Sequence, residues 1–375
     1  MGNVPHLRFP EFTGEWESFK LTELGKFIGG GTPSSSNLSF WAGSIPWISS
    51  SDIKEDSINN ISISRYITEE AIEKSTTKYC PAPVILIVSR VGVGKVALSY
   101  TSLCTNQDFC NIIEIKCHPV FLSYNLLRTM KRKSREVQGT SIKGITSDEL
   151  QKIRVFIPQD KDEQNKISNI LTLLDERIAT QNKIIEDLKK LKSAITDLLF
   201  HSIADAHTIR LGEIAHITNG AGDVQDANTE HQEDWYPFFD RSEELKWFPT
   251  YSFDKEAVIY AGEGQSFYPR YYNGKFALHQ RCYAIMDFAS CIIPKYCYHF
   301  MNTLNSYFVR NSVGSTVPSL RMDIFQKVEI RLPPIPKQQH ICKIIDAFYT
   351  KLEVEQRGIS ILQELKQFLL SQMFI

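Results

Sequence analysis

The stretch Gln164–Leu199, QNKISNILTLLDERIATQNKIIEDLKKLKSAITDLL, places apolar residues at alternating steps of four and three. This spacing is typical of a helix that buries one narrow face against a second helix. We call the ten positions of this pattern the first seam. Two of them are polar, Gln181 and Lys192. The other eight are Ile167, Leu171, Leu174, Ile178, Ile185, Leu188, Ile195 and Leu199.

The last stretch of the chain, Gln338–Ile375, repeats the pattern at an offset of 174 residues. We call its ten positions the second seam. Glu355 and Lys366 interrupt this seam where Gln181 and Lys192 interrupt the first. Its apolar positions are Ile341, Ile345, Phe348, Leu352, Ile359, Leu362, Leu369 and Met373. Two matching helices, each closing one half of the chain, indicate an internal duplication.

Shorter motifs extend this repeat beyond the helices. Leu21-Thr-Glu-Leu-Gly has its counterpart in Leu211-Gly-Glu-Ile-Ala, and each half has a strand-like run that reaches a proline before the long helix. In the first half, Val- and Ile-rich runs between about residues 28 and 118 predict a β-rich domain, whereas the corresponding part of the second half is rich in aromatic residues. We predict an α+β fold with two repeated globular α/β domains joined by two long helices. The expected ranges are 1–158 and 201–335 for the domains, and 159–200 and 336–375 for the helices.

An amphipathic helix is predicted to begin at Pro119 and to end before Gly139. Its expected buried face carries Phe121, Leu122, Leu126 and Met130. Residues 128–143 carry six basic side chains against a single acidic one, Glu136. The six are Arg128, Lys131, Arg132, Lys133, Arg135 and Lys143. In the second half, residues 295–308 predict a matching helix.

The composition is that of an ordinary soluble globular protein, with 42% hydrophobic residues and a formal net charge of −1 over 375 residues. No apolar run approaches the roughly 18 residues that span a bilayer, and the first residues lack the layout of a signal peptide. We therefore expect a cytoplasmic protein without membrane segments. The eight cysteines form no Cys-x-x-Cys pair. We expect reduced thiols, and neither a metal site nor a bound cofactor in this chain.

Motifs of catalysis are weak or missing. Gly92-Val-Gly94-Lys95 resembles the end of a phosphate-binding loop, but Val96 stands where such a loop needs Ser or Thr. A turn between two strands is the preferred interpretation. Asp108, Glu114 and Lys116 have the spacing of a metal-dependent nuclease, but such a spacing often arises by chance, and a polar strand face is the preferred interpretation. We predict no catalytic residues.

Both halves of the chain contain groups of side chains that are suited to binding a nucleic acid. Arg and Lys suit guanine edges or phosphates, and Asn and Gln can pair with adenine. The same residues are also common on sheet faces and protein interfaces. The candidate DNA-binding residues are Ser50, Arg90, Lys95, Asn106, Gln107, Tyr268, Arg270, Tyr271, Lys275, His279, Gln280 and Arg281.

Taken together, these motifs resemble the specificity subunit of type I restriction-modification systems. The first half carries GGGTPSSS, FWAGSIPWISSSDI, ILIVSRVGVGKVAL and TNQDF. The second half carries GQSFYPRYYNGKFALHQR, and both halves share a strand, a proline and a helix that opens with Glu/Gln-Gln. The resemblance implies two target recognition domains that each read one half of a split, asymmetric DNA sequence. It also implies that the two long helices pair antiparallel as a spacer.

The resemblance further implies partners for this chain besides double-stranded DNA. Two methyltransferase subunits would carry S-adenosylmethionine and the adenine-methylating site, and restriction subunits would use ATP and magnesium. The chain itself would be non-catalytic. The alternative is a scaffold that assembles other proteins through its coiled coil without touching DNA.

Overall fold

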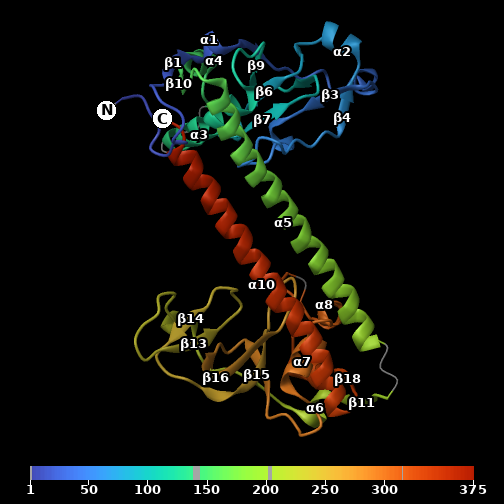
Figure 1. Cartoon of the computed structure of the whole chain (residues 1–375). Helices are drawn as coiled ribbons and strands as arrows, with labels where there is room; N and C mark the ends of the chain where they lie inside the picture. Colours follow the sequence, from blue (N-terminus) through green and yellow to red (C-terminus); the bar gives the residue numbers. More distant parts are fainter. Residues whose placement is uncertain (1, 138–143, 202–204, 315) are drawn as a thin grey trace. The chain divides into compact units, whose positions relative to one another are not determined.

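The computed structural model describes residues 2–137, 144–201, 205–314 and 316–375, and Figure 1 draws the whole chain. The chain forms two compact units, the first made of 1–183 with 357–375 and the second of 184–356. Each of the two long helices contributes one part to each unit. A unit therefore consists of one globular domain and a segment of each helix.

The described part of the first domain has two four-stranded sheets, in the orders β2-β9-β6-β7 and β4-β3-β8-β5. A separate antiparallel pair, β1-β10, brings the beginning of the domain to its end. The elements are β1 (Glu17–Lys20), α1 (Leu21–Leu24), β2 (Lys26–Gly29), β3 (Ile45–Ile48), β4 (Arg65–Ile67), α2 (Glu69–Glu73), β5 (Tyr79–Cys80), β6 (Val84–Ile87), β7 (Val96–Ser99), β8 (Leu103–Thr105), β9 (Cys110–Ile113), α3 (Pro119–Val137), α4 (Ser147–Lys152) and β10 (Arg154–Ile157).

The second domain has a six-stranded sheet in the order β12-β17-β15-β16-β13-β14 and its own closing pair, β11-β18. It consists of β11 (His207–Arg210), α6 (Leu211–Ile214), β12 (His216–Asn219), β13 (Tyr236–Phe239), β14 (Lys246–Phe248), β15 (Phe253–Ala261), β16 (Arg270–Leu278), β17 (Cys282–Met286), α7 (Pro294–Met301), α8 (Asn305–Asn311), α9 (Met322–Gln326) and β18 (Glu329–Leu332). The frame repeats: β1-α1-β2 matches β11-α6-β12, and α4-β10 matches α9-β18.

The apolar run at β6 is explained by burial on both faces of its sheet. Ile85 and Ile87 pack in the core that includes α3, whereas Val84, Leu86 and Val88 pack in a second cluster on the opposite face. Because strand side chains alternate between faces, a strand covered on both sides reads as continuously hydrophobic. The predicted buried face of α3 lies in the first of these cores, with Phe121, Leu122, Leu126 and Met130 all fully buried.

The long helices are α5 (Lys161–His201) and α10 (Ile335–Gln372), drawn in green and red in Figure 1. All positions of both seams are buried or half-buried in the structure. Within the first unit, Lys366 of α10 meets Asp175 of α5, and Gly358 lies beside the amide of Gln181. Since the later residue of α10 meets the earlier residue of α5, the helices run antiparallel, and the coiled-coil prediction is confirmed.

In each unit, a lysine at a polar seam position contacts a residue of the other long helix, and the two contacts are at equivalent positions of the repeat. In the first, the ammonium of Lys366 pairs with the carboxylate of Asp175, and both side chains are buried. In the second, the ammonium of Lys192 lies 4.0 Å from the ring centre of Tyr349. Asp175 and Tyr349 are 174 residues apart, as are Lys192 and Lys366. The duplication has therefore preserved one pair of contact positions and changed its chemistry from an ion pair to a cation–π contact.

One buried glutamine joins each domain to its long helix. Gln164 accepts a hydrogen bond from the main-chain N–H of His118 (2.9 Å) and donates to the carbonyl of Pro158 (2.8 Å). Gln338 accepts from the N–H of Ile293 (2.9 Å) and donates to the carbonyl of Pro333 (2.9 Å). These contacts tie the start of α3 or α7 to the end of β10 or β18. They explain why a glutamine recurs near the start of both helices.

The predicted helix at 295–308 is wrong in one respect, because the structure breaks it into α7 and α8. The break follows Met301, where Thr303 donates both its main-chain N–H and its hydroxyl to the carbonyl of Phe300, at 3.0 and 2.7 Å. This tight turn ends the helix before its apolar pattern ends. The helix α3 is continuous as predicted. Gly139 and Lys143 lie outside the described residues.

The turn interpretation of the glycine-rich stretch at 92–95 is confirmed. It connects the antiparallel strands β6 and β7, and both Gly92 and Gly94 have positive φ angles, at 87° and 112°. A side chain at either position would strain this backbone. The eight cysteines, all among the described residues, form no disulfide bonds. Within the described ranges, no helix has the length and apolar character needed to cross a membrane.

The buried glutamine can be tested against its neighbour on α10. Gln338→Ala should lower the free energy of unfolding by about 1–3 kcal/mol, because it leaves buried main-chain groups without partners. Gln339→Ala, one residue along and exposed, should change it by less than about 0.5 kcal/mol. Urea unfolding of the whole chain measures both values. Equal stability of the two variants would contradict the structural role of Gln338.

Candidate nucleic-acid interface

Each domain presents a four-residue turn with the same backbone contacts. Asn106–Phe109 connects β8 to β9, and His279–Cys282 connects β16 to β17. In the first turn the N–H of Asn106 donates to the carbonyl of Ile48, and in the second the N–H of His279 donates to that of Phe239, both at 2.9 Å. In each turn the last N–H bonds back to the first carbonyl. We call these the β8–β9 turn and the β16–β17 turn.

A glycine lets another segment approach each turn closely. A Cβ at Gly30 would lie 2.0 Å from the carbonyl oxygen of Asn106, and a Cβ at Gly220 would lie 1.9 Å from that of Leu278. No residue other than glycine fits such a contact without moving the backbone. The two positions follow β2 and β12, which are equivalent strands of the repeat. Both domains thus support the turn in the same manner.

The β8–β9 turn is held by polar contacts that leave its tip exposed. The buried amide of Asn106 donates to the carboxylate of Asp108 at 2.7 Å. Ser50 donates to the same carboxylate at 3.4 Å, and Lys95 donates to the carbonyl of Ser50 at 3.2 Å. The exposed tip residue, Gln107, accepts a hydrogen bond from the hydroxyl of Thr32 at 2.6 Å. The structure therefore brings these predicted residues to one surface.

Arg90 belongs to the edge of this surface. It is exposed and follows Ser89, whose N–H and hydroxyl both donate to the carbonyl of Asp108, at 2.8 and 3.1 Å. The turn between β6 and β7 is therefore fixed to the β8–β9 turn. The five candidate residues of the first domain thus lie on neighbouring segments. They are Ser50, Arg90, Lys95, Asn106 and Gln107.

The β16–β17 turn has different side chains on the same backbone. His279 is half-buried, and its ring accepts a hydrogen bond from the N–H of Arg281 at 3.2 Å. Gln280 at the tip is exposed, like Gln107. The guanidinium of Arg281 is exposed and pairs with Glu263 at 2.8 Å. The turn offers an amide and a guanidinium where the first domain offers an amide and a carboxylate.

The other candidates of the second domain are more scattered. Arg270 lies near the turn, because its guanidinium donates to the carbonyl of Asp240 at 3.2 Å, and Asp240 directly follows the strand that holds His279. Tyr268 precedes β16 and is 57% exposed. Lys275 lies 4.8 Å from the ring centre of Tyr251. These three therefore surround the turn at different distances and do not form one cluster with it.

Tyr271 lies apart from the proposed surface. Its ring packs 5.7 Å from that of Tyr298 on α7, and its hydroxyl bonds to Glu256. Burial and the nearby carboxylate of Glu256 raise the pKa of Tyr271 above its ordinary value. The structure gives this side chain a role in packing the sheet against α7.

Sequence reasoning missed one pair of charges in each domain. Arg65 of β4 pairs with Asp52 beside the β8–β9 turn, and Lys246 of β14 pairs with Asp240 at 2.7 Å beside the β16–β17 turn. Arg65 lies opposite Trp47, and Lys246 lies opposite Phe238, in equivalent strand pairs. The paired residues are 13 and 6 positions apart in the sequence, and the fold of the strand pairs brings their side chains together.

The nuclease interpretation is not supported by the geometry. Asp108 lies before the first residue of β9, whereas Glu114 lies after its last, so the strand separates the two carboxylates. Glu114 has a positive φ of 52° and pairs with Lys26 at 3.5 Å on the exposed surface. In the part of the chain that the structure describes, no group of three or more His, Cys, Asp or Glu could hold a metal ion.

Comparison with known proteins gives a family match over most of the chain. The model of the "Type I restriction modification DNA specificity domain" matches twice, at residues 13–190 and 204–367. The MjaIX type I restriction enzyme specificity subunit of Methanocaldococcus jannaschii is 25% identical over 411 aligned residues, covering 96% of this chain and 92% of that protein. The EcoR124I/EcoR124II specificity subunit of Escherichia coli is 34% identical over 192 residues, covering 49% of this chain and 46% of that protein.

Solved structures agree in fold. The S subunit of a type I restriction-modification system from M. genitalium has a TM-score of 0.64 at 17% identity, with 99% of both chains covered. A chain from a study of complex assembly and conformational transition of the type I system has a TM-score of 0.62 at 14% identity, with 96% of this chain and 97% of that chain covered. The double family match, which follows the structural repeat, shows that this chain belongs to the DNA specificity subunits of type I restriction-modification systems.

Proposed function

We propose that the two domains each read one half of a split DNA site through surfaces that include the β8–β9 turn and the β16–β17 turn. The observation that carries this proposal is the pair of turns themselves. Their backbone contacts are the same, while their exposed side chains differ in chemistry. A duplicated support with different side chains is what an asymmetric, two-part DNA sequence requires.

The side chains of the turns suit base edges in the major groove. The amides of Gln107 and Gln280 can pair with adenine, and the guanidinium of Arg281 can pair with guanine. Asp108 can accept a hydrogen bond from the amino group of cytosine. We propose that the neighbouring cations Lys95 and Arg270 contact the flanking phosphates.

We propose that the coiled coil acts as the spacer between the two reading surfaces and as a docking site for partner subunits. Exposed apolar side chains support docking, because a row of apolar side chains in contact with water does not stabilise the coiled coil and is typical of a protein-binding surface. On α5, Ile184, Leu191 and Leu198 recur every seven residues with exposures of 37%, 50% and 60%. On α10, Val354, Ile361 and Phe368 do the same with exposures of 56%, 64% and 55%.

The expected partners are two methyltransferase subunits and, in the full assembly, restriction subunits. S-adenosylmethionine, ATP and magnesium are proposed to bind to those subunits, so that this chain contributes recognition alone. We place the assembly in the cytoplasm, where host DNA is accessible. Membership of a DNA specificity family supports this function over the alternative of a scaffold without DNA contact.

Replacing residues 1–150 by those of a family relative with another specificity should change only one half of the recognised sequence. The reason is that the β8–β9 turn and its supports lie wholly within this range. Mapping methylated adenines in a host that expresses the hybrid with its methyltransferase reads the outcome. A change in both halves, or in neither, would refute the modular proposal.

Substitutions in the β16–β17 turn should weaken recognition without unfolding the domain. We expect Gln280→Ala and Arg281→Ala each to cost about 1–3 kcal/mol in binding the specific site, because each removes a hydrogen-bonding group from the reading surface. Binding of the complex to duplexes with and without the mapped site measures the loss. Lys255→Ala, which removes an exposed charge from β15 of the same sheet, is the control and should leave discrimination between the two duplexes unchanged.

Lengthening the spacer should lengthen the gap in the DNA site. One heptad inserted after Lys183 in α5 and one after Gln356 in α10 keep both seams in register and add about 10 Å, or roughly three base pairs. The methylation map should show the same half-sites with a longer gap. A single insertion in α5 alone is the control and should abolish activity by mismatching the seams. An unchanged gap in the double insertion would disprove the ruler.

A further inference from the structure

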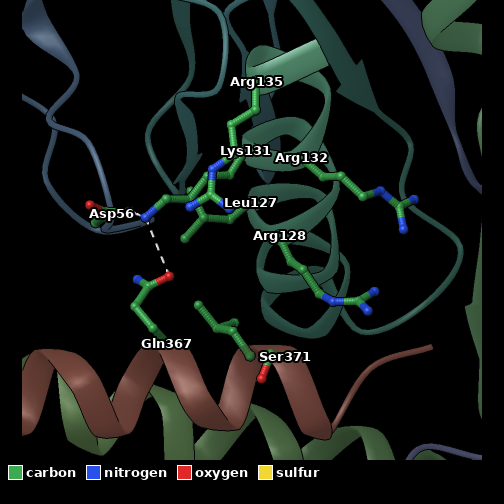
Figure 2. A pocket seen from close by; sticks show the side chains of 9 residues that line it. Asp56, Leu127, Arg128, Lys131, Arg132, Arg135, Gln367 and Ser371 are labelled. Carbon is green, nitrogen blue, oxygen red and sulfur yellow. Dashed lines mark hydrogen bonds and ion pairs between the residues drawn. The ribbon is translucent and has the colours of Figure 1, made fainter.

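The end of α3 and the last turns of α10 enclose a basic pocket of about 210 Å³ in the first unit (Figure 2). Its charged lining comes mostly from one helix, with Arg128, Lys131, Arg132 and Arg135 spread over two turns of α3. Asp56 is the only acidic residue among the described residues that line it. A pocket with this excess of positive charge is suited to an anion.

Two of the four cations already have structural partners. The guanidinium of Arg128 donates to the carbonyl of Ile375 at 2.7 Å. The ammonium of Lys131 lies 2.7 Å from the carboxylate of Asp56 and 3.3 Å from the amide oxygen of Gln367. Burial and the neighbouring charge of Arg132 lower the pKa of Arg128. These two side chains attach α3 to the end of α10 and to the loop that contains Asp56.

The remaining two cations are available. Arg132 and Arg135 are exposed, and none of the described residues forms an ion pair or hydrogen bond with either. Figure 2 shows the guanidinium of Arg132 directed away from Asp56 and Gln367. The two residues are three positions apart, about 4.5 Å along the helix axis, and Figure 2 shows the guanidinium of Arg135 on the side of Asp56, opposite to that of Arg132. Guanidinium groups bind phosphates through two parallel hydrogen bonds.

The basic end of α3 adjoins the reading surface of the same domain. A Cβ at Gly94 would lie 3.2 Å from the hydroxyl of Ser134, so this helix touches the turn between β6 and β7. Lys95 of that turn donates to Ser50, and Ser50 donates to Asp108 in the β8–β9 turn. Direct contacts therefore connect the proposed base-reading turn to α3.

The segment of the second domain that matches the basic end of α3 carries much less positive charge. The matching residues, 303–318, carry one basic side chain, Arg310, whereas residues 128–143 carry six. The positive charge is therefore a property of the first domain and not of the shared frame. A contact required equally by both halves, such as the docking of two like subunits, does not call for this asymmetry.

We infer that Arg132 and Arg135 bind phosphates of the DNA backbone beside the half-site read by the first domain, and that this domain supplies more of the salt-dependent affinity than the second. The inference rests on the proposed DNA-reading function. Direct continuity with the β8–β9 turn favours DNA as the anion over an acidic segment of a partner protein.

The test is the salt dependence of DNA binding by the complex of this chain with its methyltransferase subunits. Fluorescence anisotropy with a random-sequence duplex suffices, because phosphate contacts do not depend on sequence. The double variant Arg132→Gln with Arg135→Gln should reduce the slope of log K against log salt by about 2, since each phosphate contact contributes about 0.9. Affinity at low salt should fall roughly tenfold or more.

The control is Lys183→Gln with Lys190→Gln, which removes the same charge from exposed positions of α5 and should leave the slope unchanged. Equal slopes for the two double variants would overturn the inference while leaving the proposed function intact. Loss of the methyltransferase subunits from the Arg132/Arg135 variant on gel filtration would overturn it in favour of a protein partner. Salt-independent binding by the unaltered complex would refute the proposed function as well.

Discussion

The antiparallel contact of α5 with α10 is the constraint on which both units depend, and the buried pair of Lys366 with Asp175 shows how it is specified. A charge inside an apolar seam is costly unless it has a partner. Any shift of one helix along the other would leave Lys366 among aliphatic side chains and Asp175 without its cation. The pair therefore contributes more to the choice of register than to stability. In the second unit, Lys192 and Tyr349 mark the same register with a weaker contact.

The register would have no consequence for recognition if the domains moved freely on the helices. Gln164 and Gln338 prevent this by satisfying main-chain groups at the start of α3 or α7 and at the end of β10 or β18. The hydroxyl of Tyr124 adds a hydrogen bond of 2.8 Å from α3 to Asp175, the same carboxylate that meets Lys366. The first domain, its supporting helix and the coiled coil thus share one buried polar network.

On this common support the two domains differ in what they expose. The β8–β9 turn and the β16–β17 turn share a backbone but not their side chains, and the basic end of α3 exists in the first domain alone. Duplicated segments that face the core remain alike because packing constrains them. Segments that face solvent are free to diverge, and these are the segments suited to contact DNA.

The sequence by itself determined the repeat, the two long helices and their seams, because helical periodicity is a local property that ten positions record clearly. It also predicted TNQDF and ALHQR as parts of a binding surface, and both motifs lie at equivalent turns of the two domains. It could not show that Asn106 and His279 occupy equivalent turns, because β3 and β13 complete those turns from residues distant in the chain. The pairs of Asp52 with Arg65 and of Asp240 with Lys246 also depend on the fold, because the strand pairs β3–β4 and β13–β14 set which side chains meet. Only the tertiary structure decided which basic residues of α3 contact Asp56 or the end of α10, and which of them are exposed and suited to binding an anion.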